Sequence, residues 1–162
     1  MSWNMERKFS HYLQIEKRRS KMRGYSAIGL INTKTEANVG GALRACSCYG
    51  ASLVAIQGKR YKREATDTTA SWRHIPLIHT DNLKDIIPFD CIPVAIEITD
   101  DARNLINFVH PGRAFYIFGP EDGSIPREVL DWCEFKVKIP TAICMNLAST
   151  VNVVLYDRLA KS

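Results

Sequence analysis

The sequence has no long apolar run and no recognisable disulfide framework. No hydrophobic stretch approaches the ~20 residues that a membrane-spanning helix needs, and residues 1–21 lack the apolar core of a secretory signal. The five cysteines are an odd number without framework spacing, which is typical of a reducing compartment. We therefore expect an intracellular, cytoplasmic protein that has no membrane partner.

The chain also lacks the residue patterns of common metal and nucleotide sites. Cys46 and Cys48 form a C-x-C pair, but no second pair and no histidine cluster completes a zinc site. Gly40 and Gly41 belong neither to a Walker loop nor to a G-x-G-x-x-G pattern. The sequence therefore predicts no metal site and neither of these two phosphate-binding loops.

What the sequence does contain is one domain with unevenly placed charge. Its 162 residues are 46% hydrophobic and 24% charged, as in ordinary globular domains. Residues 1–24 hold seven Lys/Arg against two Glu, which accounts for the whole net charge of +5. A second basic cluster, "KRYKR", occupies residues 59–63. We expect a basic arm (1–24) and a single domain (25–162). The two clusters favour a nucleic-acid partner over a merely solvated arm and loop.

Apolar runs rich in β-branched residues alternate with helical patterns along the domain. The expected strands are 25–31, 51–57, 74–79, 91–98, 113–119 and 135–140. The expected helices are about 38–49, one within 81–87, 126–133, and one from about residue 146 onward. This alternation predicts an α/β fold, a mainly parallel sheet with helices on both faces. Such sheets bind ligands after the carboxyl ends of their strands, here just after Ile31, Ile98, Phe118 and Ile139.

Two of the loops after these strands carry candidate polar residues. In the loop and helix at 32–45, Asn38 is a good helix N-cap. Arg44 lies in an apolar run, either as a surface arginine or as a partly buried guanidinium aimed at a phosphate or a developing oxyanion. Glu121 is held between Gly119 and Gly123, which makes it a candidate ligand or orienting group.

The segment 139–157, "IPTAICMNLASTVNVVLYD", is apolar but interrupted by short polar side chains. These side chains are Thr141, Asn146, Ser149, Thr150 and Asn152. Buried polar groups need hydrogen-bond partners, so a plain core helix normally avoids them. We interpret the segment as the place where a strand, a ligand-binding loop and a helix start converge.

Three motifs follow predicted strands in a fixed order. They are Asn-Val-Gly-x-x-x-Arg at 38–44, Phe-Gly-Pro-Glu-Asp-Gly at 118–123, and Ile-Pro at 139–140 followed by Met-Asn-Leu at 145–147. Together they resemble the SpoU (TrmH-like) branch of the SPOUT RNA methyltransferases, over roughly residues 25–160. The resemblance implies S-adenosylmethionine-dependent methylation of a ribose 2′-hydroxyl in tRNA or rRNA. It also implies a homodimer and a deep C-terminal trefoil knot.

The resemblance assigns roles to particular residues. The implied catalytic residues are Arg44, Asn38, Glu121 and Asn146. The implied cofactor-binding residues are Ile96, Gly119, Ile139, Cys144, Met145 and Leu147. This sequence departs from the family pattern in a shorter loop after Pro140, and in Cys144 and Ala148, which stand where the family usually has serines.

Two alternatives belong to other functional classes. One is a protein that binds S-adenosylmethionine and RNA without turnover, which the joint retention of Arg44, Glu121 and Asn38 argues against. The other is a SPOUT methyltransferase that modifies a base, which would usually offer an aspartate as base. Substrate choice is expected to lie in the basic arm, in the 59–63 cluster, in residues 68–74, or across the dimer.

Overall fold

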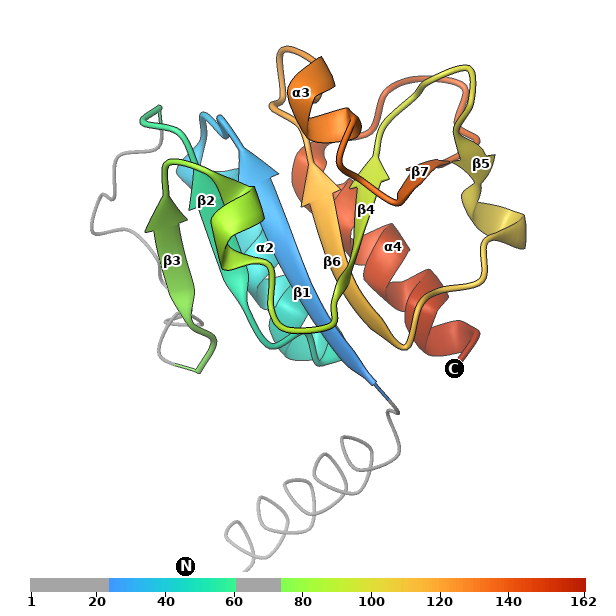
Figure 1. Ribbon diagram of the computed structural model, residues 1–162, viewed down its shortest axis with the longest axis horizontal. Helices are drawn as coiled ribbons and strands as arrows, with labels where there is room; N and C mark the ends of the chain where they lie inside the picture. Colours follow the sequence, from blue (N-terminus) through green and yellow to red (C-terminus); the bar gives the residue numbers. More distant parts are fainter. Residues whose placement is uncertain (1–23, 61–73) are drawn as a thin grey trace, which may run out of the picture.

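A seven-stranded parallel sheet forms the centre of the protein (Figure 1). The computed structural model describes residues 24–60 and 74–162. Almost all of the basic arm and most of the 59–63 and 68–74 segments lie outside the described residues. Within the described part, the strand order is β3-β2-β1-β6-β4-β7-β5, and every strand pair is parallel.

The strands are β1 (Tyr25–Ile31), β2 (Val54–Gln57), β3 (Leu77–Thr80), β4 (Ile92–Ile96), β5 (Arg103–Asn104), β6 (Arg113–Phe118) and β7 (Phe135–Lys138). The α-helices are α2 (Glu36–Tyr49), α3 (Arg127–Leu130) and α4 (Leu147–Ala160). Two 3-10 helices complete the described elements, η2 (Leu83–Ile86) and η3 (Leu105–Asn107).

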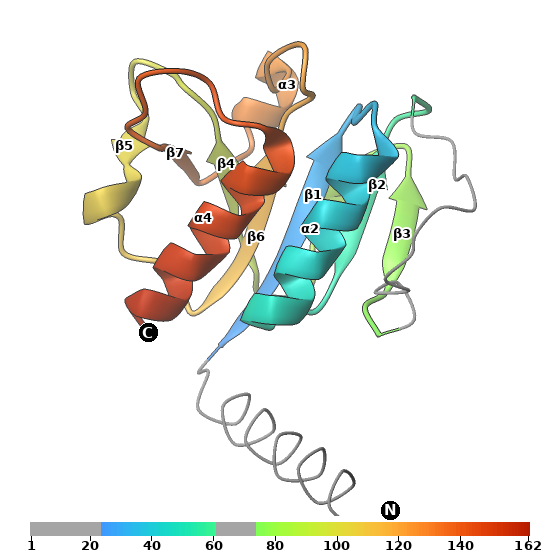
Figure 2. The same ribbon diagram turned by 180° about the vertical axis from the view of Figure 1, so that it is seen from behind.

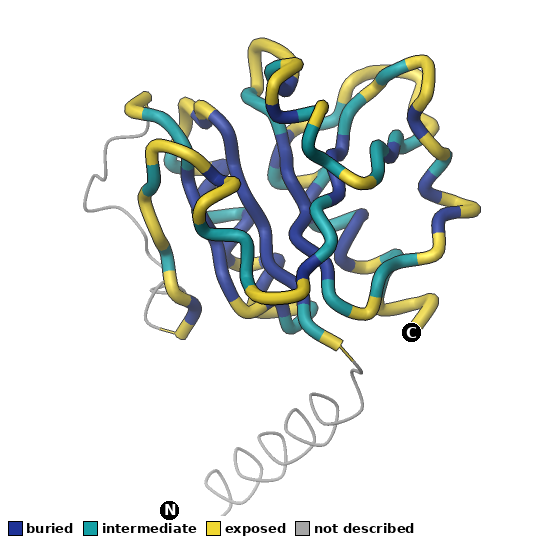
Figure 3. Tube along the Cα trace, viewed as in Figure 1, coloured by how far each residue is buried: buried dark blue, intermediate teal, exposed yellow. Residues whose placement is uncertain are grey.

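The two central strands, β1 and β6, are buried nearly throughout, as Figure 3 shows. Their continuous apolar sequences suit strands that are covered on both faces. They pair in parallel register from Tyr25 beside Arg113 to Leu30 beside Phe118. Their carboxyl ends therefore lie side by side, and the loops that follow them start from neighbouring points.

The two long helices lie on one face of the sheet, α2 beside α4 (Figure 2). They cover a core that includes Ile28, Val39, Tyr116, Val151 and Leu155. Within the described ranges, the opposite face carries the short elements η2 and α3, with Leu83 and Val129 buried against it. Helical segments are thus present on both faces as expected, but the cover is strongly unequal.

Most expected elements are confirmed, with two corrections. The strand at 25–31 has the predicted bounds, and α4 starts directly after Asn146 as predicted. β5 and η3 were not expected, because two or three residues leave no periodic pattern. The assignment of Asn38 as a helix N-cap is wrong: α2 begins at Glu36 with Thr35 at its N-cap position, so Asn38 lies inside the first turn.

A buried polar network fixes the last turns of α4. The His110 ring contacts the Tyr116 hydroxyl at 2.6 Å through Nδ1 and the Asp157 carboxylate at 2.8 Å through Nε2. Burial lowers the pKa of His110 even though Asp157 is adjacent. Arg158 donates hydrogen bonds to the carbonyls of Pro111 and Gly112. These contacts fix the carboxyl-terminal end of α4 against β6, and the amino-terminal end of the same helix lies at the candidate site.

Candidate active site

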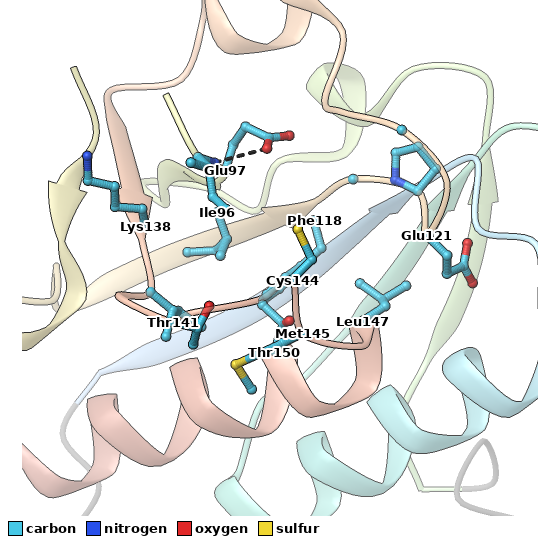
Figure 4. A pocket seen from close by; sticks show the side chains of 15 residues that line it. Ile96, Glu97, Phe118, Glu121, Lys138, Thr141, Cys144, Met145, Leu147 and Thr150 are labelled. Carbon is cyan, nitrogen blue, oxygen red and sulfur yellow. Dashed lines mark hydrogen bonds between the residues drawn. The ribbon is translucent and has the colours of Figure 1, made fainter. Parts of the chain in front are cut away.

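A pocket opens at the carboxyl ends of β4, β6 and β7 (Figure 4). Its cavity volume is about 180 Å³, and its mouth is open. The lining residues are Ile96, Glu97, Ile98, Phe118, Gly119, Pro120, Glu121, Gly123, Lys138, Ile139, Thr141, Cys144, Met145, Leu147 and Thr150. Three segments far apart in the sequence thus build one site, at the edge of the sheet where the strand pattern predicted it.

All six residues expected to bind a cofactor line this pocket. They are Ile96, Gly119, Ile139, Cys144, Met145 and Leu147. Figure 4 shows the side chains of Ile96, Phe118, Cys144 and Leu147 gathered around one space, whereas that of Lys138 points away from it. The walls therefore combine apolar side chains with polar groups in roughly equal measure, the polar side chains being those of Glu97, Glu121, Lys138, Thr141 and Thr150.

The glycine after β6 lets the chain fold back tightly beside the pocket. A Cβ atom at Gly119 would lie 3.1 Å from both the backbone nitrogen and the Cγ1 atom of Ile125. Ile125 is itself held by Glu97, whose carboxylate accepts a hydrogen bond from its N–H at 2.7 Å. Glu97 thereby ties the end of β4 to the loop after β6 and fixes one wall of the pocket.

The carboxylate of Glu121 accepts hydrogen bonds from the loop that follows β1. Asn38 donates to Oε1 through its Nδ2 atom at 2.7 Å, and the Thr33 hydroxyl donates at 3.0 Å. The N–H of Lys34 donates to Oε2 at 3.0 Å. Thr35 donates through its N–H at 3.3 Å and its hydroxyl at 3.1 Å. One side chain from the loop after β6 therefore organises four residues around the start of α2.

These donors keep Glu121 ionised. Partial burial acts to raise the pKa of its carboxyl, but the hydrogen bonds from Asn38, the backbone and Thr33 outweigh burial and lower the pKa to about 2. The carboxylate is therefore an acceptor only at neutral pH. This state in turn fixes the Asn38 side chain with its amide nitrogen toward Glu121.

The orientation passes from Asn38 to Asn146 at the start of α4. The Asn38 amide oxygen accepts a hydrogen bond from Asn146 Nδ2 at 2.9 Å. The Asn146 oxygen is then free to cap α4, where it accepts from the N–H groups of Ala148 at 2.9 Å and Ser149 at 3.4 Å. The hydrogen bonds from Glu121 through Asn38 to Asn146 thus connect three loops and set the start of α4.

Helices α2 and α4 approach each other closely beside this chain of hydrogen bonds. A Cβ atom at Gly41 would lie only 2.6 Å from the Cβ of Ala148, closer than two carbon atoms can come. Small residues on both helices therefore allow the approach that brings Asn38 and Asn146 within hydrogen-bonding distance. Gly40, by contrast, has no atom within 4 Å of such a position.

Of the predicted site residues, Arg44 alone lies outside both the pocket and the hydrogen-bonded network. Its side chain is exposed and has no hydrogen-bond or ion-pair partner within 24–60 and 74–162. The partly buried placement considered for it is therefore wrong. Its spacing of three residues from Gly41 places it on the side of α2 that meets α4.

The polar side chains of the 139–157 segment have three different uses. Asn146 is the cap of α4. Thr141 and Thr150 line the pocket. The Thr150 hydroxyl and Asn152 Nδ2 also donate to carbonyl groups of the preceding turn, those of Asn146 and Ala148. The interpretation of the segment as a point of convergence therefore agrees with the geometry, although part of its polarity is satisfied within α4 itself.

Sequence reasoning missed Thr33 and Glu97. Thr33 is fully buried two residues after the end of β1, and Glu97 directly follows β4. Both positions follow strands at the sheet edge that was predicted to hold the site, and this placement was the available signal.

The described residues contain no group of three or more His, Cys, Asp or Glu side chains placed to hold a metal ion. None of the helices in the described ranges has the length and apolar character needed to cross a membrane.

Comparison with known proteins identifies what this chain is similar to. The model of the SpoU rRNA Methylase family matches residues 26–156. No curated protein matches the sequence.

Solved structures share the fold at low sequence identity. The SpoU methyltransferase AviRb from Streptomyces viridochromogenes, in complex with AdoMet, has a TM-score of 0.76 and 15% identity, covering 85% of this chain and 60% of AviRb. The A. aeolicus TrmH/SpoU tRNA modifying enzyme has a TM-score of 0.74 and 17% identity, covering 93% and 83% of the two chains. A structure that concerns 2-OH methylation on tRNA has a TM-score of 0.70 and 18% identity, covering 86% and 97%. The chain thus spans about three fifths of AviRb.

The contact between Gly41 and Ala148 generates a stability prediction. Gly41→Ala places a methyl group 2.6 Å from Ala148 Cβ, so we expect α4 to shift and the free energy of unfolding to fall by about 1–3 kcal/mol. Urea unfolding of the purified protein measures the change.

Gly40→Ala is the matched control on the same helix. With no atom within 4 Å of its added methyl group, this variant gains about 0.5–1 kcal/mol from helix propensity. Equal stabilisation by the two substitutions would contradict the close approach of α2 and α4.

Proposed function

This chain belongs to the SpoU family of methylases, and from that premise we propose that it is an S-adenosylmethionine-dependent RNA methyltransferase. The proposed reaction transfers a methyl group to a ribose 2′-hydroxyl of tRNA or rRNA. The observation that carries the proposal is the position of Glu121. This residue lines the pocket and also anchors the hydrogen bonds to Asn38 and Asn146. A ligand in the pocket therefore lies beside an ordered polar site.

The pocket fits the cofactor by the chemistry of its walls. Ile96, Phe118 and Leu147 offer buried apolar surface to the adenine ring. The turn at Gly119 and the chain near Ile139 bring backbone groups to the pocket. Backbone contacts do not depend on the serines that Cys144 and Ala148 replace. We therefore propose that the six predicted residues hold S-adenosylmethionine largely through their main chain and apolar side chains.

The protein's main task in this reaction is positioning. S-adenosylmethionine supplies a methyl group on a sulfonium that is already activated for transfer. Holding the ribose oxygen in line with that group lowers the activation barrier by ~7–11 kcal/mol. Fixed loops on a rigid parallel sheet serve this purpose, because they keep both binding surfaces in one arrangement before the substrates meet.

We propose that Arg44 acts on the ribose 2′-hydroxyl. An arginine stays protonated in proteins, so it is a poor free base. Its exposed guanidinium has no partner within the described ranges, which leaves its N–H donors available to RNA. In the proposed role it stabilises the developing alkoxide and holds the adjacent phosphate.

Glu121 acts as a positioning residue in this scheme. Its oxygens are already occupied by hydrogen bonds from the 33–38 segment, and its pKa of about 2 makes it a weak proton acceptor. Asn38 and Asn146 inherit their orientation from it. We therefore propose that Glu121 determines the shape of the site, and that Asn38 and Asn146 present fixed amide groups toward the reacting ribose.

Methylation of a base is the second candidate and has less support. Such a reaction usually employs an aspartate base, and the aspartate of this loop is Asp122. Both Asp122 oxygens accept hydrogen bonds from Arg60, each at 2.8 Å. The hydrogen bonds from Arg60, acting against the smaller effect of burial, lower the pKa of Asp122 to about 2. An aspartate held in this way is poorly suited to remove a proton.

We also propose a cytoplasmic homodimer with a knotted C-terminal segment. Tyr156 and Leu159 expose apolar surface on α4. The ring of Tyr156 packs edge to face on that of Tyr49 of α2, with 6.1 Å between the ring centroids. A second copy packed on this face would cover them. Light scattering distinguishes a dimer from the 18.3 kDa chain. The proposal of a knot rests on membership of the SpoU family.

The decisive test of the reaction uses labelled S-adenosylmethionine. We expect the protein to transfer label to total RNA, and nuclease digestion should place it in 2′-O-methyl nucleosides. Label in a methylated base would instead support the second candidate. Cofactor binding in calorimetry without any transfer would identify a binding protein that lacks turnover.

Substitution of Arg44 tests the role of the planar guanidinium. Arg44→Lys keeps the charge but loses the fork geometry, so we expect kcat to fall by about 10²-fold while cofactor affinity is unchanged. Arg103→Lys at the opposite edge of the sheet is the control and should leave kcat unaltered. Near-wild-type activity of Arg44→Lys would sink the proposed role.

A further inference from the structure

A closed ring of contacts joins three loops at the mouth of the site. The first loop is 32–35 after β1, the second is 58–60 after β2, and the third is 119–122 after β6. Glu121 joins the third loop to the first, as described above. Two further contacts complete the ring, and one of them, the Arg60–Asp122 ion pair, has so far served only to argue against Asp122 as a base.

The first of these contacts packs the β2 loop against the β1 loop. The N–H of Asn32 donates to the carbonyl of Gln57, the last residue of β2, at 2.8 Å. Gly58 has a φ of +107°, and a Cβ atom there would lie 2.1 Å from Asn32 Oδ1. Only a glycine fits this position without displacing Asn32. The chain that leads to Lys59 and Arg60 is therefore held directly against the β1 loop.

The second contact is the ion pair between Arg60 and Asp122. Nη1 and Nη2 of Arg60 donate to the two carboxylate oxygens of Asp122, each at 2.8 Å. An isolated exposed ion pair contributes little to stability, because water screens both charges. A bidentate pair that closes a ring also fixes direction, because the planar guanidinium must face the planar carboxylate.

The ring leaves two lysines unpaired at its rim. Lys34 and Lys59 are exposed, and the side-chain ammonium group of neither has a hydrogen-bond or ion-pair partner in the described part of the chain. Lys34 lies close enough to Asp122 to contribute to lowering its pKa. Lys59 is the neighbour of Arg60. Lys34 thus lies near the loop that carries Glu121, and Lys59 directly precedes the residue that is tied to this loop.

We propose that Lys34 and Lys59 bind backbone phosphates of the RNA substrate, and that Arg60, through Asp122, is a positioning residue that holds them beside the site. Arg60 itself makes no phosphate contact, because its guanidinium is already neutralised by Asp122. This inference rests on the proposed RNA methyltransferase function. It separates two adjacent basic residues of the 59–63 cluster, which sequence reasoning treated alike.

Salt-dependent binding of fluorescently labelled bulk tRNA, measured without S-adenosylmethionine, tests the two lysines. Each phosphate contact contributes roughly 0.7–0.9 to the slope of log Kobs against log salt. We expect Lys34→Gln and Lys59→Gln each to reduce the slope by about that amount and to weaken binding about fivefold at low salt. Arg103→Gln, at the opposite edge of the sheet, is the matched loss of one positive charge and should retain the wild-type slope.

The double variant Arg60→Gln/Asp122→Asn tests the positioning role at constant net charge. We expect the slope to stay at its wild-type value and the affinity to fall by about fivefold, the upper end of what an exposed ion pair contributes. A reduced slope would show that Arg60 contacts a phosphate. An unchanged affinity would show that the ion pair positions nothing.

The outcomes also separate this inference from the proposed function. If the wild-type protein binds tRNA with a steep salt slope and both lysine variants keep that slope, the proposed phosphate contacts of Lys34 and Lys59 are overturned. The methyltransferase proposal then stays intact. Wild-type protein that binds no RNA overturns both. Unchanged cofactor affinity of the lysine variants in calorimetry shows that the pocket itself is undisturbed.

Discussion

The carboxylate of Glu121 is the interaction on which the site's arrangement depends. Among residues 24–60 and 74–162 it forms no salt bridge, and neutral donors from the loop after β1 and from Asn38 stabilise it. Neutral donors hold an anion without cancelling its negative charge, so the surroundings keep a directed field. The Asn38 amide aligns in that field, and Asn146 follows. The order of the site therefore comes from one ionised group and the hydrogen-bonding capacity of two amides.

A steric constraint operates alongside this electrostatic one. Amides can align only if the two helices that carry them come close enough, and Gly41 facing Ala148 permits that distance. The family's usual serine at the position of Ala148 would add an oxygen near this contact. Alanine keeps the methyl-sized volume and removes a polar group that would need a partner. The departure from the family pattern at this position is thus compatible with the tight helix packing.

The sequence allowed much of the framework to be predicted, because its strongest signals are local. Continuous apolar residues defined β1 and β6, and the loops after them were the right places to look for a site. The errors arose where contacts with residues distant in the sequence determine the placement of a side chain or strand. Asn38 is of a residue type that often caps helices, yet its side chain donates a hydrogen bond to Glu121, 83 residues away in the chain. The exposure of Arg44 depends on how α4 packs, which no local pattern contains. The very short β5 exists only because β7 offers it an edge.

The hydrogen bond between Asn38 and Asn146 has a consequence for biosynthesis. It joins residues separated by 108 positions, and the second of them begins the last helix of the fold. Domains emerge from the ribosome with their amino-terminal parts first. The sheet strands can pair while α4 is still being made, but the polar network stays incomplete until that helix docks. A nascent chain can therefore acquire its framework well before it acquires an ordered site.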